Sequence, residues 1–278
     1  MTPASSWEHP EILELISLAL REDIGSGDIT TQTCIPADRM AEGRWFAREG
    51  CVLAGVELLP LILPGVESIE LLRSSGETVV AGLAVARVRG SARSLLECER
   101  TSLNFLQRLS GVATLAHRYA ESVAHTKCRV LDTRKTTPGF RRLEKLAAAA
   151  GGITNHRMGL WDAVLIKNNH ITAAGGVRQA LERFAGTDLE VEIEVRSREE
   201  LDEALASGAK HLLLDNLTPA EARIWIEYIG GRATVELSGN ITLETVKAYA
   251  ETGADFVSSG AITHQATSVN FNFRIELD

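Results

Sequence analysis

The chain has 278 residues, of which 45% are apolar and 24% are charged, and its formal net charge is −8. This length can bury a large core as one or two α/β domains, and the acidic balance argues against nucleic acid or a membrane surface as a partner. No apolar run approaches the ~20 residues that a spanning helix needs, and the first residues lack the basic and apolar blocks of a signal peptide.

The first part of the chain has a mixed α+β pattern. Apolar residues at helical spacing predict a helix over residues 10–23, with Pro10 in its first turn. Strand-like stretches follow at 43–47, 51–54, 68–72 and 78–88, with a short helical segment near 56–62. A long helix is then predicted from about residue 92 to residue 109, broken near Gly111 and resumed through Val123.

From Cys128 onward, strands and helices alternate. We expect strands at residues 129–132, 163–167, 189–195, 211–215, 234–238 and 255–259, and helices at 141–150, 177–184, 199–207, 220–229 and 243–252. Repeated β-then-α units require parallel strands with right-handed crossovers. Their close spacing indicates a barrel, although six strands are fewer than the usual eight. The alternating tail 270–277 predicts a strand that returns to the N-terminal domain.

Polar and charged residues follow the predicted strands, at the ends where such barrels carry their active sites. In strand order they are Thr133, Arg134 and Lys135; Lys167; Glu194; Asp215; Ser238, Gly239 and Asn240; and Ser259, Gly260 and Ala261. The connection between the first two strands adds His156 and Arg157. Five basic or titratable groups on one rim of an acidic protein are unfavourable unless an anion offsets their charge. We therefore expect a site for a multiply anionic small molecule.

Each of these residues also has a simpler interpretation. A single Lys or Arg after a strand is usually a solvated charge, and Glu194 and Asp215 could pair with the lysines. Two acids beside a phosphate site also suit Mg²⁺, or the ribose hydroxyls. The small residues at the last two strand ends fit a phosphate cradle formed by backbone N–H groups. On the helix that follows the first strand, we expect a solvated face of Arg141, Arg142 and Lys145.

The scattered cysteines Cys34, Cys51, Cys98 and Cys128 match no zinc or redox spacing. We expect them to be reduced, mostly structural thiols of a cytoplasmic protein.

Several of these segments resemble the quinolinate phosphoribosyltransferase family. They are Asp132-Thr-Arg-Lys-Thr-Thr-Pro-Gly139, Gly151-Gly-Ile-Thr-Asn-His-Arg-Met-Gly-Leu160, Leu165-Ile-Lys-Asn-Asn-His170 and Ser259-Gly-Ala-Ile-Thr-His264, and the match extends to residues 27–31 and 99–104. The resemblance implies an N-terminal α/β sandwich domain (1–110, joined by the C-terminal strand 270–278) and an incomplete, about seven-stranded α/β barrel (111–269). It also implies a Mg²⁺-dependent pentosyltransferase that converts quinolinate and phosphoribosyl pyrophosphate into nicotinate mononucleotide, pyrophosphate and CO₂ in NAD biosynthesis.

The resemblance also implies roles for particular residues. Arg134, His156, Arg157 and Lys167 would line the quinolinate pocket, together with Arg100 from the neighbouring subunit of a homodimer or larger assembly. Lys135, Lys167, Glu194 and Asp215 would surround the ribosyl pyrophosphate and its metal, with Lys135, Glu194 and Asp215 as the catalytic set, and Thr133 in the same loop. Ser238-Gly239-Asn240 and Ser259-Gly260-Ala261 would hold the phosphate, although Asn240 stands where many members have glycine and Ser259 where valine is frequent.

Two other interpretations remain open. One is the paralogous protein associated with molybdate transport, which lacks the full Thr-Thr-Pro-Gly and Leu-Ile-Lys-x-Asn-His forms present here. The other is a non-catalytic barrel that binds a phosphometabolite and regulates a partner, which predicts binding without turnover.

Overall fold

The computed structural model describes residues 7–277, which divide into two compact units. One unit holds Arg118–Lys135 and Ile153–Ile262, and the other holds 7–117, Thr136–Gly152 and 263–277. Helix α4 (Ala92–Val123) contributes residues to both. Within the described range, no helix is both long and apolar enough to cross a membrane.

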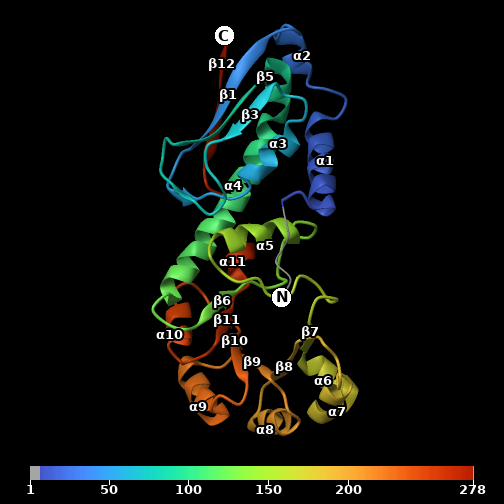
Figure 1. The fold of residues 1–278 in the computed structure, drawn as a ribbon, viewed down its shortest axis with the longest axis vertical. Helices are drawn as coiled ribbons and strands as arrows, with labels where there is room; N and C mark the ends of the chain where they lie inside the picture. Colours follow the sequence, from blue (N-terminus) through green and yellow to red (C-terminus); the bar gives the residue numbers. More distant parts are fainter. Residues whose placement is uncertain (1–6, 278) are drawn as a thin grey trace. The chain divides into compact units, whose positions relative to one another are not determined.

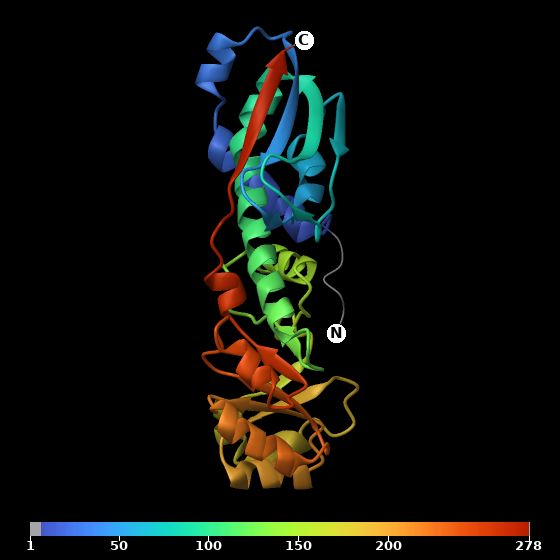
Figure 2. The same ribbon diagram turned by 90° about the vertical axis from the view of Figure 1, so that its left-hand side faces the viewer.

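The N-terminal unit is built on a four-stranded antiparallel sheet in the order β12-β1-β5-β3 (Figure 1). These strands are β12 (Phe271–Leu277), β1 (Met40–Ala47), β5 (Ala84–Ser91) and β3 (Ser68–Leu71). Buried and half-buried residues alternate along β1, as expected for a sheet covered on one face. Helix α4 runs along the sheet (Figure 2), and Trp45 Nε1 donates a hydrogen bond to Ser102 Oγ on this helix at 2.9 Å. The antiparallel β1–β12 pair confirms the predicted return of the tail.

Smaller elements complete this unit. They are α1 (Pro10–Ile24), α2 (Ile29–Cys34), β2 (Cys51–Val52), η1 (Val56–Leu58), α3 (Leu59–Ile62), β4 (Thr78–Val79) and α5 (Arg141–Ala150). The strand predicted over 78–88 is divided into β4 and β5 by a turn in which Gly82 has a φ of +85°. The solvated face predicted for α5 is wrong at Lys145, which is fully buried, and Arg142 pairs with Glu11 at 2.8 Å.

The predicted helix break near Gly111 is also wrong, because α4 is continuous. A Cβ atom at position 111 would overlap with the carbonyl oxygen of Thr267 and lie 3.1 Å from the Cα of Ser268. The glycine therefore allows the segment before β12 to pass directly against the helix. Close packing of two backbones explains this glycine, and a helix end does not.

The second unit contains six parallel strands in the order β6-β11-β10-β9-β8-β7. They are β6 (Arg129–Leu131), β7 (Val164–Ile166), β8 (Val191–Val195), β9 (His211–Asp215), β10 (Thr234–Ser238) and β11 (Phe256–Ser258), which confirms all six predicted strands. An isolated parallel bridge between Leu131 and Thr154 adds a rudimentary seventh position beside β6. The predicted fold class, an incomplete α/β barrel with an N-terminal α/β domain, is confirmed.

Helices follow these strands along the chain. They are α6 (Asn168–Ala174), α7 (Val177–Glu182), α8 (Arg198–Ala206), α9 (Pro219–Ile229), α10 (Val246–Ala250) and α11 (Ala261–His264), and α7 to α10 lie outside the strands (Figure 1). The short helices α2, α6 and α11 were not predicted. Because the six strands are parallel, their C-terminal ends meet at one edge of the sheet, and the residues that follow them are brought together.

Candidate active site

A cavity of about 400 Å³ lies at the C-terminal ends of the parallel strands, within one unit. Ten residues predicted from the strand ends line it: Thr133, Arg134, Lys135, His156, Arg157, Lys167, Asp215, Ser238, Gly239 and Asn240. The other lining residues are Leu165, Leu213, Asn216, Glu236 and Ser258. The structure thus brings together most of the predicted rim.

Five predicted residues are not among those that line this cavity. Glu194 is only 5% exposed, and its Oε2 lies 3.8 Å from Lys167 Nζ, which does line the cavity. Ser259 is buried and its Oγ donates to the carbonyl oxygen of Ile241 at 2.6 Å. Gly260 and Ala261 continue from it into α11. Arg100 is exposed on α4 in the other unit.

The buried carboxylate of Asp132 fixes the loop that carries His156 and Arg157. Its Oδ1 accepts the backbone N–H of His156 at 2.8 Å, and its Oδ2 accepts Nδ2 of Asn155 at 2.7 Å. Asp132 is fully buried, where polar groups are stable only if they are hydrogen-bonded. Asp132, which follows β6, therefore holds residues 155–157 in place, and the two segments form one wall of the cavity.

Arg157 supplies a largely buried positive charge to this wall. Its side chain is oriented by a 3.0 Å hydrogen bond from Nη1 to the carbonyl oxygen of Ala163, and the residue is 7% exposed. Burial, and then the nearby charge of Arg134, lower the pKa of Arg157. Both causes reflect a cation that is poorly solvated and close to a like charge. An anion bound between these two guanidinium groups would relieve both.

The ends of β9 and β10 form a strained turn pair. Asn216 and Asn240 adopt left-handed conformations with φ of +58° and +51°. The Nδ2 of Asn216 donates to Asp215 Oδ2 at 2.6 Å, and its backbone N–H donates to Ser238 O at 2.9 Å. A Cβ atom at Gly239 would overlap with the side-chain oxygen of Asn216 and lie 2.7 Å from its backbone nitrogen. Glycine is therefore required here, and successive turn N–H groups of this kind bind anions.

Two acidic residues beside His156 were not among the predicted site residues: Glu236, which lines the cavity, and Glu192, which does not. Nε2 of His156 lies 3.4 Å from Glu192 Oε2 and 3.5 Å from Glu236 Oε2. Glu236 is 4% exposed; burial, and then the charge of Glu192, raise the pKa of Glu236 to about 8. The sequence signal that could have revealed Glu236 is an acidic residue in the middle of an apolar strand, Thr234-Val-Glu-Leu-Ser238.

The donor atoms of His156, Glu192 and Glu236 all lie within 4.8 Å of one another, a spacing that a metal ion could bridge. However, Nδ1 of His156 accepts the backbone N–H of Arg157 at 2.7 Å. The proton of the neutral ring is then on Nε2, which leaves no lone pair toward the two carboxyl groups. This cluster suits a shared proton better than a metal. Glu194 and Asp215 remain the oxygen donors suited to Mg²⁺.

Comparison with known proteins gives one consistent result. The model of the quinolinate phosphoribosyl transferase N-terminal domain matches residues 28–110, and that of the C-terminal domain matches residues 112–274. A chloroplastic nicotinate-nucleotide pyrophosphorylase (carboxylating) of Oryza sativa subsp. japonica is 38% identical, over 99% of this chain and 81% of the relative. A probable nicotinate-nucleotide pyrophosphorylase (carboxylating) of Bacillus subtilis is 36% identical, over 97% and 95%. The solved nicotinate-nucleotide pyrophosphorylase of Francisella tularensis has a TM-score of 0.93 at 35% identity, over 99% of this chain and 100% of that chain.

Proposed function

This chain belongs to the quinolinate phosphoribosyltransferase family, and we propose that the cavity at its parallel strand ends holds both substrates of that reaction. The enzyme transfers the phosphoribosyl group of phosphoribosyl pyrophosphate to quinolinate with loss of CO₂. The products are nicotinate mononucleotide, pyrophosphate and CO₂, and the reaction serves NAD biosynthesis.

The observation that carries the proposal is the concentration of positive charge in one cavity. Arg134, Lys135, Arg157 and Lys167 line the same 400 Å³ space of a chain whose net charge is −8. Quinolinate carries two carboxylates and its partner carries several phosphate charges, so the two reactants repel each other. A preorganised cationic cavity lowers this repulsion and holds the reacting atoms together.

The quinolinate pocket is assigned to Arg134, His156, Arg157 and Lys167. Arginine suits a carboxylate because its planar guanidinium offers two parallel donors. Arg157 has one such donor committed to Ala163, so its remaining N–H groups are available to orient the ligand. With the carboxylates held, the pyridine nitrogen can attack C1′ of the ribose as pyrophosphate leaves.

The ribosyl pyrophosphate is assigned to Lys135, Lys167, Glu194 and Asp215, with Thr133 in the loop that carries Lys135. Thr133 Oγ1 accepts the backbone N–H of Lys135 at 3.0 Å, which shapes the turn. A carboxylate beside C1′ would stabilise the oxocarbenium-like state, and Asp215 is held for this role by Asn216. The turns Ser238-Gly239-Asn240 and Ser259-Gly260-Ala261 are assigned to the phosphate.

Mg²⁺ is the proposed cofactor. Glu194 and Asp215 present only oxygen donors, the kind that Mg²⁺ prefers. Glu194 Oε2 lies 3.8 Å from Lys167 Nζ, and Asp215 lines the same cavity as Lys135 and Lys167. When bound, the ion would neutralise charge on the leaving pyrophosphate.

The assembly is proposed to be a homodimer, or a larger assembly of dimers, in which Arg100 completes the partner's quinolinate pocket. An exposed arginine on α4 is compatible with this role. A cytoplasmic location is also proposed, supported by four free cysteines, of which three are buried.

One assay tests the function directly. Purified protein is incubated with quinolinate, phosphoribosyl pyrophosphate and Mg²⁺, and nicotinate mononucleotide and CO₂ are measured together. Equal amounts of both products are expected. Binding of both substrates by calorimetry without any product would overturn the proposal in favour of a binding protein.

A further inference from the structure

We propose that Glu236 is the acid that delivers a proton to the substrate ring carbon after CO₂ departs, and that this proton is replaced from solvent through the barrel interior. The inference rests on the proposed function. It deepens that function by assigning a step to a side chain that neither the strand-end pattern nor the family motifs single out.

Glu236 lies at a boundary between two cavities. It lines the substrate cavity together with His156 and Arg157, and the same three residues line a second cavity of about 170 Å³ deeper in the barrel. Its position in the middle of β10, below Ser238, places it beneath the rim that would hold the reactants. A carboxyl group at this boundary can reach the substrate on one side and, on the other, a second cavity that is large enough to hold water.

The surroundings of Glu236 keep it protonated. Its carboxyl group lies close to that of Glu192 from β8, since their oxygen atoms and a ring nitrogen of His156 all lie within 4.8 Å of one another. Burial and the Glu192 charge favour the neutral form of Glu236, and they outweigh His156 and the Ser258 hydroxyl, which favour the charged form. Arg134, Lys135, Arg157, Lys167 and Asp215 are the other charged groups that line the substrate cavity. A neutral acid beneath this cationic rim also avoids placing a negative charge next to a dianionic substrate.

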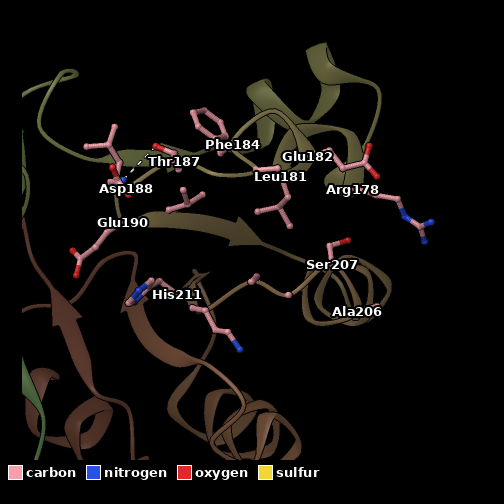
Figure 3. Close-up of a pocket in the computed structure, with 16 residues that line it drawn as sticks. Arg178, Leu181, Glu182, Phe184, Thr187, Asp188, Glu190, Ala206, Ser207 and His211 are labelled. Atoms are coloured by element: carbon pink, nitrogen blue, oxygen red, sulfur yellow. Dashed lines mark hydrogen bonds between the residues drawn. The ribbon is translucent and has the colours of Figure 1, made fainter.

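The deeper cavity provides the return path for the proton. Glu190, His211 and Thr234 line its far side, and Nδ1 of His211 lies 2.7 Å from Thr234 Oγ1. Glu190 and His211 also line a separate open cavity of about 720 Å³, and Figure 3 draws both among its lining residues. The interior chamber and the open cavity therefore share a wall of titratable groups. Protons can reach Glu236 from that end even when the substrate cavity is filled.

The proton from Glu236 would be transferred after the bond to CO₂ has broken. When the carboxylate beside the quaternised ring nitrogen leaves as CO₂, the electron pair of the broken C–C bond stays on the ring carbon. The O–H bond of Glu236 breaks, its proton forms a new C–H bond with that electron pair, and Glu236 becomes a carboxylate. A proton from water then restores the acid.

The test compares Glu236→Gln with Glu236→Asp, and Glu227→Gln on the exposed face of α9 is the control. Glutamine keeps the size and the hydrogen bonding but cannot deliver an acidic proton. The single-turnover rate of nicotinate mononucleotide formation should fall about 100-fold or more in Glu236→Gln, while aspartate restores part of it. In the wild-type enzyme this rate should decrease as pH rises through about 8, and this decrease should be absent in Glu236→Gln. A Glu236→Gln rate near that of wild type, or an unchanged alkaline decrease, would overturn the inference.

A second variant keeps the inference testable if Glu236→Gln does not fold. Glu192→Gln removes the negative neighbour that favours the protonated form of Glu236, so the alkaline decrease should move to lower pH. No movement would overturn the inference. If the wild-type enzyme forms no nicotinate mononucleotide, the proposed function fails and this inference fails with it; if only the variants behave like wild type, the inference alone fails.

Discussion

The carboxylate of Asp132 at the end of β6 accepts the backbone N–H of His156, 24 residues later in the chain, at 2.8 Å. Asp132 is fully buried and does not line the cavity, but its hydrogen bonds hold the loop that carries His156 and Arg157. The positions of His156 and Arg157 therefore depend on a residue whose role is structural.

We predict that Asp132→Asn destabilises the fold and weakens quinolinate binding together. Asparagine would replace one of the two carboxylate oxygens that accept from His156 and Asn155 with an NH₂ group, so a buried donor loses its partner, at about 1–3 kcal/mol. Urea unfolding should report a loss of that size, and the KM for quinolinate should rise. Asp38→Asn, at an exposed position, is the control and should change neither value. An unfolding midpoint equal to that of wild type would contradict the structural role of Asp132.

Gly239→Ala should impair the use of phosphoribosyl pyrophosphate. Gly239 has a φ of +102°, and a methyl group there would collide with Asn216, which orients Asp215. Displacement of this turn should raise the KM for phosphoribosyl pyrophosphate about 10-fold or more. Gly231→Ala is the matched control, because Gly231 also has a left-handed φ of +75° but no atom near its Cβ position. Equal effects of the two alanines would show that backbone strain alone is responsible.

Lys135→Ala should abolish turnover with little change in stability. Lys135 is exposed within the cavity, and an exposed charge contributes little to folding. The loss of a cation that contacts the pyrophosphate should lower kcat about 100-fold or more. Lys127→Ala removes a lysine that pairs with Asp255 at 2.8 Å and does not line the cavity. It should retain wild-type kcat, and both variants should melt near the wild-type Tm. A Lys135→Ala enzyme with normal kcat would remove Lys135 from the catalytic set.

Sequence pattern predicted the parallel unit well because its signals are local. The bounds of β9, β10 and α5 agree with the structure to the residue. The residues at the rim of the site could be predicted from these strands, since parallel strands place their last residues at one edge of the sheet. The pattern could not show which interior side chains meet, because the strand order places β6 next to β11 rather than next to β7. The proximity of Glu236 to Glu192 and His156 depends on that strand order. The glycine at position 111 of α4 is explained by contact with a segment more than 150 residues away.

The stability of the protein should depend on the ionisation of Glu236. Its pKa is about 8 in the folded state against 4.5 for an ordinary glutamate, so between these values the native state holds a proton that the unfolded state has released. The stability that Glu236 contributes is fully present below pH 4.5, and it is lost as pH rises from there through about 8. The free energy of unfolding of Glu236→Gln relative to wild type should therefore increase from about pH 5 to about pH 8. Urea titrations across this range measure it, and a constant difference would contradict the raised pKa.

The proposed role of Arg100 can be tested by subunit mixing. If each site combines Arg100 from one subunit with Lys135 from the other, Arg100→Ala and Lys135→Ala homodimers should both be inactive. Random mixing would form heterodimers in which one site has lost both residues and the other has kept both. About a quarter of wild-type activity should then return, as measured by nicotinate mononucleotide formation after the mixture has been unfolded and refolded together. Two different affinity tags would establish that heterodimers are present. Heterodimers without activity would place Arg100 in the site of its own subunit or outside the site, because an arginine shared between subunits must restore one site in every heterodimer.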